Sequence, residues 1–320
     1  MVTSGLLISS FTLKKRFKRS EEKIGLNPYK FKNFKSDFDI LTHLKNFMIT
    51  HQEIRDDVKK KKLFGIDIKT IKELDGINYR AITCIIKCGS YGIEAEITNR
   101  DTKNVVYTRR ENEADTKKFR CLFYIPKNVE NNVTVKGIVV FQMIGNFGVK
   151  SITTEYLKNY FSQIEITYES NMISISNYFQ RIIRDDKLSK ITFVKNNISP
   201  DDSDNIFVNK GKEERSYIMP QLKNNIFDKI LGLIETRSNG ISSIIEIEDK
   251  EYDDIKMAFK VGDSTKTISI QNISQFSIIE DVPDEIYRIA IINPEIFIEY
   301  IIETIKPYCD NMIIHHNLEE

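Results

Sequence analysis

Residues 79–88, YRAITCIIKC, and residues 119–125, FRCLFYI, decide the fold class of this chain. Both are short runs rich in β-branched and aromatic residues, which strands favour. They belong to a series of such runs between Leu63 and Gly145, with Gly, Asn, Asp or Pro between consecutive runs. Short strands at this spacing predict an antiparallel meander or a partly closed barrel.

The same patterns predict the other elements of the chain. The expected strands are 6–13, 63–74, 79–88, 93–98, 105–108, 119–125, 133–144, 190–194, 241–247, 254–261 and 265–270. Apolar residues recur at helical spacing in 37–51, 153–161, 176–185, 221–235 and 294–307. Ser36 is expected to cap the first of these helices. Polar loops are expected at 199–204 and 209–214.

The two halves of the chain carry opposite charge. Residues 1–150 contain 29 Lys and Arg against 17 Asp and Glu, a net charge of +12, whereas residues 151–320 contain 18 and 29, a net charge of −11. A chain of this length also suits two domains. We therefore predict an α+β protein with a basic, strand-rich N-terminal domain (1–150) and an acidic domain of helices and a short antiparallel sheet (151–320). A loop region near 196–215 is expected to be mobile.

The composition argues against secreted and membrane classes of protein. No stretch approaches the roughly 18 consecutive apolar residues of a membrane span, and the apolar start of the chain precedes its lysines instead of following them. Four cysteines do not make a disulfide scaffold, and Cys84 and Cys88 would lie about 13 Å apart along one strand. We expect a cytoplasmic protein that does not associate with a membrane.

Motifs for catalysis and cofactor binding are absent from the sequence. Gly89-x-x-Gly92 and Gly145-x-x-Gly148 lack the Lys-Ser/Thr of a phosphate-binding loop, so they are interpreted as turn glycines, with a phosphate loop at 145–150 as the alternative. The best nuclease fragment is Asp67-Ile68-Lys69 with Glu73 downstream, although alternating polar residues on a solvated strand face explain it more simply. We predict no catalytic residue, no metal ligand and no cofactor.

Basic clusters near aromatic residues are the positive functional signal. Lysines and arginines gain by releasing counterions from a phosphate backbone, and aromatic side chains can stack on bases. The predicted nucleic-acid-binding residues are Lys14, Lys15, Arg16, Lys18, Arg19, Lys59, Lys60, Lys61, Lys62, Arg109, Arg110, Lys117 and Lys118, with Arg120 beside the last cluster. The aromatic residues nearby are Phe17, Tyr29, Phe31, Phe34, Tyr79, Tyr107 and Phe119. Two alternatives remain open: the lysines are simply solvated, or the basic half docks on an acidic half.

Three stretches carry a resemblance to other proteins: GSYGIEAEI (89–97), GIVVFQMIGNFGVK (137–150) and KTISI (266–270). They resemble segments of uncharacterised bacterial proteins from phage-defence loci. None of the stretches is a catalytic motif, so the resemblance implies a role in antiviral defence without a mechanism.

Together these observations lead us to expect a non-enzymatic binding component of an antiphage system. Its basic half would contact nucleic acid, and its acidic half a protein partner or a second copy of the chain. The alternatives are a metal-dependent, nuclease-like effector with a site built from scattered acids, and a structural oligomer assembled by opposite charges.

Overall fold

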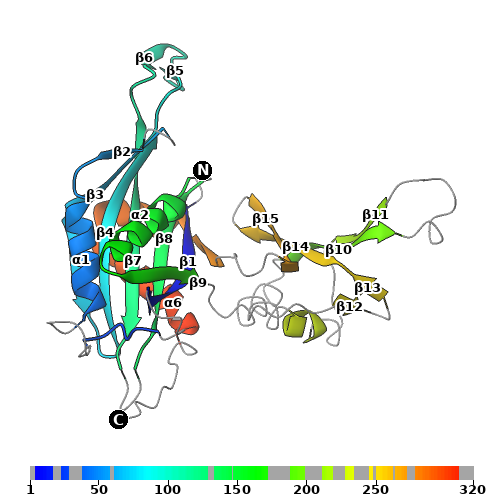
Figure 1. Cartoon of the computed structure of the whole chain (residues 1–320). Helices are drawn as coiled ribbons and strands as arrows, with labels where there is room; N and C mark the ends of the chain where they lie inside the picture. The colour runs from blue at the N-terminus through cyan, green and yellow to red at the C-terminus, as the bar shows by residue number, and fades with distance from the viewer. Residues whose placement is uncertain are drawn as a thin grey trace, which may run out of the picture.

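The computed structural model describes residues 4–16, 23–28, 38–57, 61–128, 133–145, 147–171, 188–198, 211–218, 228–233, 245–247, 250–261, 264–271 and 278–309. Within these residues the protein is α+β with antiparallel sheets, as the sequence predicts (Figure 1). The predicted helix at 176–185 lies outside the described residues, as does most of the predicted helix 221–235, of which 228–233 are helical. The predicted cap Ser36 is wrong, because the first helix begins at Ile40 and its N-cap is Asp39.

The main sheet has the strand order β16-β1-β8-β7-β4-β3-β2, and β9 also pairs with β1. The meander expected from the turn spacing is present in its centre, because β3, β4, β7 and β8 are neighbours in that order. The strands are β1 (Ser4–Lys15), β2 (Arg55–Asp57), β3 (Lys62–Asp75), β4 (Tyr79–Ser90), β7 (Asp115–Pro126), β8 (Lys136–Ile144), β9 (Ile166–Asn171) and β16 (Ile278–Val282).

Strands from both halves of the chain build this sheet. Ser4 to Ile8 pair with Ile278 to Val282 of β16, and Ser10 to Lys15 pair with Ile166 to Asn171 of β9. The main sheet therefore contains strands from both sides of residue 150. The strands β2, β9 and β16 were not among the elements expected from the sequence.

Each face of the main sheet is covered by helices. α1 (Ile40–Thr50) and α2 (Lys150–Gln163) pack on one face, in a buried cluster with Phe123 that we call the α1–α2 core. α6 (Pro294–Ile305) packs on the other face, in a buried cluster with Leu122 that we call the α6 core. Successive residues of β7 alternate between the two cores, as side chains of a strand must. α5 (Asp284–Ile292) and the 3₁₀ turn Lys306–Tyr308 flank α6.

A second sheet is built from the later part of the chain, in the order β11-β10-β14-β15, and β12 pairs separately with β13. Apolar residues of β10 and β14, such as Ile191 and Met257, belong to the α6 core. The predicted loop at 209–214 is wrong for residues 211–214, which lie in β11 and pair with β10. The strands are β10 (Leu188–Ile198), β11 (Gly211–Ile218), β12 (Ile245–Ile247), β13 (Lys250–Tyr252), β14 (Asp254–Val261) and β15 (Ser264–Ser269).

A two-stranded hairpin of β5 (Ala95–Thr98) and β6 (Val105–Arg109) connects β4 to β7, and we call it the arm. It projects beyond the end of the main sheet (Figure 1). Apolar side chains on it are left in solvent: Ile93 is 70% exposed and Val106 is 63% exposed. The arm therefore adds little to either core.

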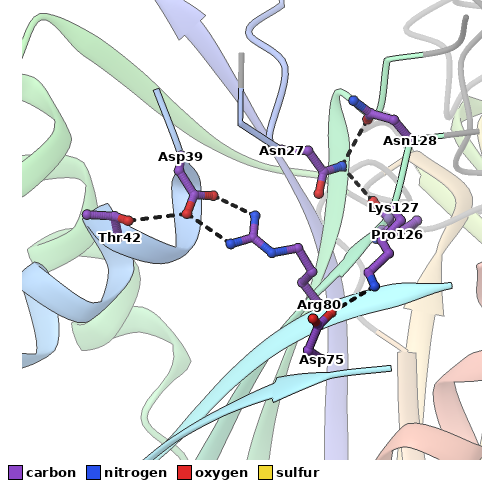
Figure 2. Close-up of polar contacts among 8 residues, drawn as sticks. All are labelled: Asn27, Asp39, Thr42, Asp75, Arg80, Pro126, Lys127 and Asn128. Carbon is purple, nitrogen blue, oxygen red and sulfur yellow. Dashed lines mark hydrogen bonds and ion pairs between the residues drawn. The ribbon is translucent and has the colours of Figure 1, made fainter. Parts of the chain in front are cut away.

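Polar contacts connect the segment before α1 to the end of the main sheet that lies opposite the arm (Figure 2). The side-chain amide of Asn27 donates to the carbonyl oxygen of Pro126 and to Oδ1 of Asn128, each at 2.9 Å. Lys127 pairs with Asp75 at 2.8 Å. These bonds hold the β7–β8 connection against residues that are between about 50 and 100 positions away in the sequence.

Of the helices in the described part of the chain, none combines the length and apolar character needed to cross a membrane.

Candidate nucleic-acid interface

The predicted nucleic-acid-binding residues fall into two groups at opposite ends of the main sheet. Ser4 of β1 pairs with Ile144, whereas Thr12 pairs with Lys136, so Lys14 lies ten residues from the Ser4 end. At about 3.3 Å per residue, the two ends are about 33 Å apart. Lys14, Lys15 and Arg16 lie at one end, and Lys61, Lys62, Arg109, Arg110, Lys117 and Lys118 lie at the other, near the arm. Lys18, Arg19, Lys59 and Lys60 lie outside the described residues.

The end of β1 is held by the C-terminal turn of α2 and by β9. The Arg16 guanidinium donates to Oγ of Ser162 at 2.6 Å, and the Arg16 backbone N–H donates to the carbonyl oxygen of Glu165 at 3.0 Å. Lys14 pairs with Glu169 of β9 at 3.0 Å, and both side chains remain partly exposed. These contacts position the basic side chains at the surface.

Three further cations join this group, one from the segment just after β1 and two from parts of the chain more than 100 residues away. Lys23 forms an isolated bridge with Lys14, and Lys136 lies opposite Thr12 on the adjacent strand. Lys158 lines the same surface as Arg16. Within the described residues, Lys23, Lys136 and Lys158 have no ion pair. We call Lys14, Lys15, Arg16, Lys23, Lys136 and Lys158 together the β1-end cluster.

The cations of the β1-end cluster repel one another, and the carboxylate among them balances this repulsion only in part. Burial, together with the charge of Lys23, lowers the pKa of Lys136 below its ordinary value. Glu169 is paired with Lys14, so its charge is already in use. A polyanion that brought negative charge to this surface would relieve the repulsion.

An open hollow of about 610 Å³ lies beside the end of β1. Polar and apolar atoms contribute about equally to its lining, which includes two cations and one carboxylate. The lining residues are Arg16, Lys158, Asn159, Ser162, Ile166, Thr167, Tyr168, Glu169 and Ser170.

Several cations of the group near the arm form contacts within the arm or at its base. Arg109 donates to the carbonyl oxygen of Ile93 at 3.1 Å. Glu113 accepts hydrogen bonds from Tyr107 and from the backbone N–H of Arg110, so it offsets the charge of both arginines. Lys117 pairs with Asp115. The arm is therefore a mixed-charge element and not a basic ribbon.

Two of the aromatic residues proposed to stack on bases pack against other residues of the protein instead. Phe119 is buried in the α1–α2 core, and Tyr79 stacks on Tyr124 at a centroid distance of 4.9 Å. Phe17, Tyr29, Phe31 and Phe34 lie outside the described residues. Tyr107 is exposed, but it lies on the arm. Among the described residues, the β1-end cluster offers phosphate contact, and none of the predicted stacking aromatics lies in it.

The nuclease fragment is divided by a bulge in β3. Asp67 lies opposite Ile85 and pairs with Lys87 at 3.0 Å, whereas Glu73 lies opposite Ile82 and pairs with Lys45 of α1. Adjacent strand positions alternate in direction, so the two carboxylates point to opposite faces of the sheet. They cannot share a metal ion. No group of three potential metal ligands occurs among the residues that the structure describes.

The glycines considered for phosphate binding have backbone roles. Gly92 and Gly145 have φ angles of 95° and 57°, in the left-handed region where a side chain is strained. A Cβ on Gly89 would lie 2.6 Å from the backbone oxygen of Asp115 on the neighbouring strand. Tight turns and close strand approach explain these three glycines.

Comparisons of this chain with protein-family models, with curated proteins and with solved structures found no match. The function must therefore be argued from the surface itself.

Proposed function

We propose that this protein is a non-enzymatic binding component of a bacterial antiphage system and that its β1-end cluster contacts the phosphate backbone of a nucleic acid. One observation carries the proposal: cations from four separate segments gather around the end of β1, and two of them, Arg16 and Lys158, line an open hollow. Each lysine or arginine that neutralises a phosphate releases a counterion, which is the main source of sequence-independent affinity. The antiviral context is supported by the resemblance of three segments and is part of the proposal.

The acidic half supplies a surface for a protein partner in this proposal. The outer sides of α5 and α6 carry the exposed carboxylates Glu285, Glu299 and Glu303, with Arg288 and Lys306 as the basic residues there. A partner with a basic surface would match this charge and be recognised faster at low salt. Cross-linking and affinity capture from a host that expresses the chain, with Glu285→Lys/Glu299→Lys as the matched variant, test this part.

The nucleic-acid proposal is tested by fluorescence anisotropy with labelled single-stranded DNA, duplex DNA and RNA over about 50 to 300 mM salt. The test variant is Lys23→Gln/Lys136→Gln/Lys158→Gln, which removes the three cations without an ion pair among the described residues. Each lysine that contacts a phosphate contributes about 1 to the magnitude of the slope of log K against log salt. The magnitude of this slope should therefore be smaller by up to about 3 in the triple variant.

A matched control removes three exposed cations elsewhere. Lys69→Gln/Arg100→Gln/Lys103→Gln changes the net charge by the same amount, at positions far from the end of β1. This control should bind like the native protein. Equal loss in both variants would indicate a general charge effect, and salt-independent binding or no binding would remove the proposal.

A further inference from the structure

Arg120 occupies an unusual position near the arm end of the main sheet. Its neighbours Phe119 and Cys121 point into the α1–α2 core, so the Arg120 side chain points to the opposite face, where α6 lies. Arg120 is only 7% exposed. Its backbone N–H donates to Oε1 of Gln142 at 3.0 Å, which fixes the strand at this point.

The guanidinium of Arg120 has no hydrogen bond or ion pair with any residue that the structure describes. Arg80, by contrast, is less buried and is paired at two points with Asp39. A guanidinium offers five N–H donors, and burying it without a partner is costly. Burial accordingly lowers the pKa of Arg120, and the charge of Glu295 offsets this only in part.

The carboxylates near Arg120 are already engaged by other cations. Asp67 pairs with Lys87, and Glu295 pairs with Lys72. Lys118 lies two residues before Arg120 on the same face of β7 and opposite Lys87. Like Arg120, it has no ion pair within the described residues. Neither cation therefore has an ion pair of its own among the described residues, and Glu295 and Asp67, which act on them electrostatically, are each paired with another lysine.

The first turn of α6 adds to the positive potential at this point. Glu295, at the start of α6, pairs with Lys72, which lies opposite Thr83 of β4. Arg120 lies opposite Ile85, two residues further along β4, so the start of α6 is close to Arg120. Pro294 has no N–H and the Glu295 N–H is bonded to Oδ1 of Asn293, so it is the helix dipole that favours an anion at this end.

We propose that Arg120 and Lys118 bind a phosphate group beside the first turn of α6. The planar fork of a guanidinium matches two oxygens of a phosphate, and Lys118 supplies a second, more exposed charge. The phosphate group can belong to inorganic phosphate or to a nucleotide, since both present the same oxygens.

This site is separate from the β1-end cluster. Arg120 bonds to Gln142, which lies opposite Leu6, and Leu6 precedes Lys14 by eight residues, or about 26 Å along β1. The two proposals can therefore fail independently. The Lys23→Gln/Lys136→Gln/Lys158→Gln protein should lose nucleic acid and keep its affinity for phosphate.

Isothermal titration of the full chain with inorganic phosphate and with adenosine 5′-monophosphate tests the site. Arg120→Met should weaken phosphate binding at least 10-fold, and Lys118→Gln roughly 3- to 10-fold. Glu295→Gln should strengthen binding, because it removes a negative charge close to the phosphate. Lys103→Gln, which removes an exposed charge on the arm, is the matched control and should change nothing.

The two ligands distinguish the sources of the phosphate. Tighter binding of the nucleotide assigns the site to a nucleotide, and equal affinity assigns it to phosphate itself. No heat of binding for either ligand up to about 10 mM, which corresponds to an interaction weaker than about 3 kcal/mol, overturns the proposal. Unchanged affinity in both Arg120→Met and Lys118→Gln also overturns it, and Lys118→Gln decides the question if Arg120→Met does not fold.

Discussion

Asp39 and Arg80 form a two-point ion pair that joins the start of α1 to the beginning of β4 (Figure 2). Nη1 of Arg80 donates to Oδ1 of Asp39 at 2.7 Å, and Nη2 donates to Oδ2 at 2.9 Å. Thr42 donates to the same carboxylate at 3.2 Å. The side chains are 17% and 22% exposed, so the pair is largely shielded from water. It fixes where α1 begins on the sheet.

Removing either partner of this pair should destabilise the protein. Arg80→Met leaves a shielded carboxylate without its cation, and we expect a loss of about 2 kcal/mol in the free energy of unfolding. Asp39→Asn should cost a similar amount. Urea denaturation of both single variants and of the double variant measures the coupling. Strictly additive losses would contradict a direct interaction between these residues.

The same pair should make stability depend on acid pH. Burial acts to raise the pKa of Asp39, but the hydrogen bonds and charge of Arg80 outweigh it, so the pKa is lowered from 3.8. The unfolded chain therefore takes up the proton first as the pH falls. The contribution is fully present above the unfolded value of 3.8 and is lost as the pH falls through the lower folded value.

The measurement is the free energy of unfolding of the native protein and of Asp39→Asn between about pH 6 and pH 2.5. The difference between the two proteins should be constant at the upper end and shrink toward the lower end. A difference that grows as the pH falls would reverse the sign and refute this account.

Two buried tyrosines should respond in opposite ways to loss of the hydroxyl. Tyr168 is 2% exposed, is stacked between Phe11 and Phe161, and has a hydroxyl without a hydrogen bond among the described residues. Tyr308 donates its hydroxyl to the buried Glu280. We expect Tyr168→Phe to stabilise the protein by about 1 kcal/mol, because it removes an unsatisfied polar group.

Tyr308→Phe should destabilise by about 1 to 3 kcal/mol, because it leaves the Glu280 carboxylate with one donor fewer. Thermal unfolding of the two variants under one set of conditions gives the comparison. A destabilised Tyr168→Phe protein would indicate that this hydroxyl has a partner, such as a buried water.

The arm should be removable without unfolding the main sheet. The backbone N–H of Gly92 donates to the carbonyl oxygen of Glu111 at 2.6 Å, so the two chains are already close at the base of the arm. Replacing residues 94–109 with Asn-Gly, a two-residue hairpin turn, should change the free energy of unfolding by less than about 1 kcal/mol. Thermal unfolding and circular dichroism check this. Loss of cooperative unfolding would show that the arm supports the sheet.

Strands were predicted well wherever a local pattern suffices. The turn-bounded runs at 79–88, 119–125 and 254–261 correspond closely to β4, β7 and β14, and the helix at 294–307 corresponds to α6 and the turn after it. Turn residues and side-chain alternation act within a few positions, so they can be read directly. β16 was missed because it is only five residues long, whereas the apolar residues of α5 do recur at helical spacing, so this helix could have been predicted.

The candidate site could be predicted only in part. Lys14, Lys15 and Arg16 are adjacent in the sequence and remain together in the structure. Lys136 was not foreseen as a member of the cluster, because it reaches Lys14 only through the pairing of β8 with β1. Lys23 was also left out, although it is only nine residues from Lys14 and bridges to it. The excess of basic residues in one half of the sequence also concealed their separation into two ends of one sheet.

The sequence alone determined the local alternatives: which stretches are strands, where turns fall, and that lysines and arginines gather before residue 150. These depend on backbone preferences and side-chain periods over a few residues. Only the tertiary structure decided that β1 lies between β8 and the two strands β9 and β16, that Asp67 and Glu73 face opposite ways, and that Arg120 is buried with no ion pair among the described residues. Strand register sets all three, and register is chosen by packing two faces at once across the whole chain.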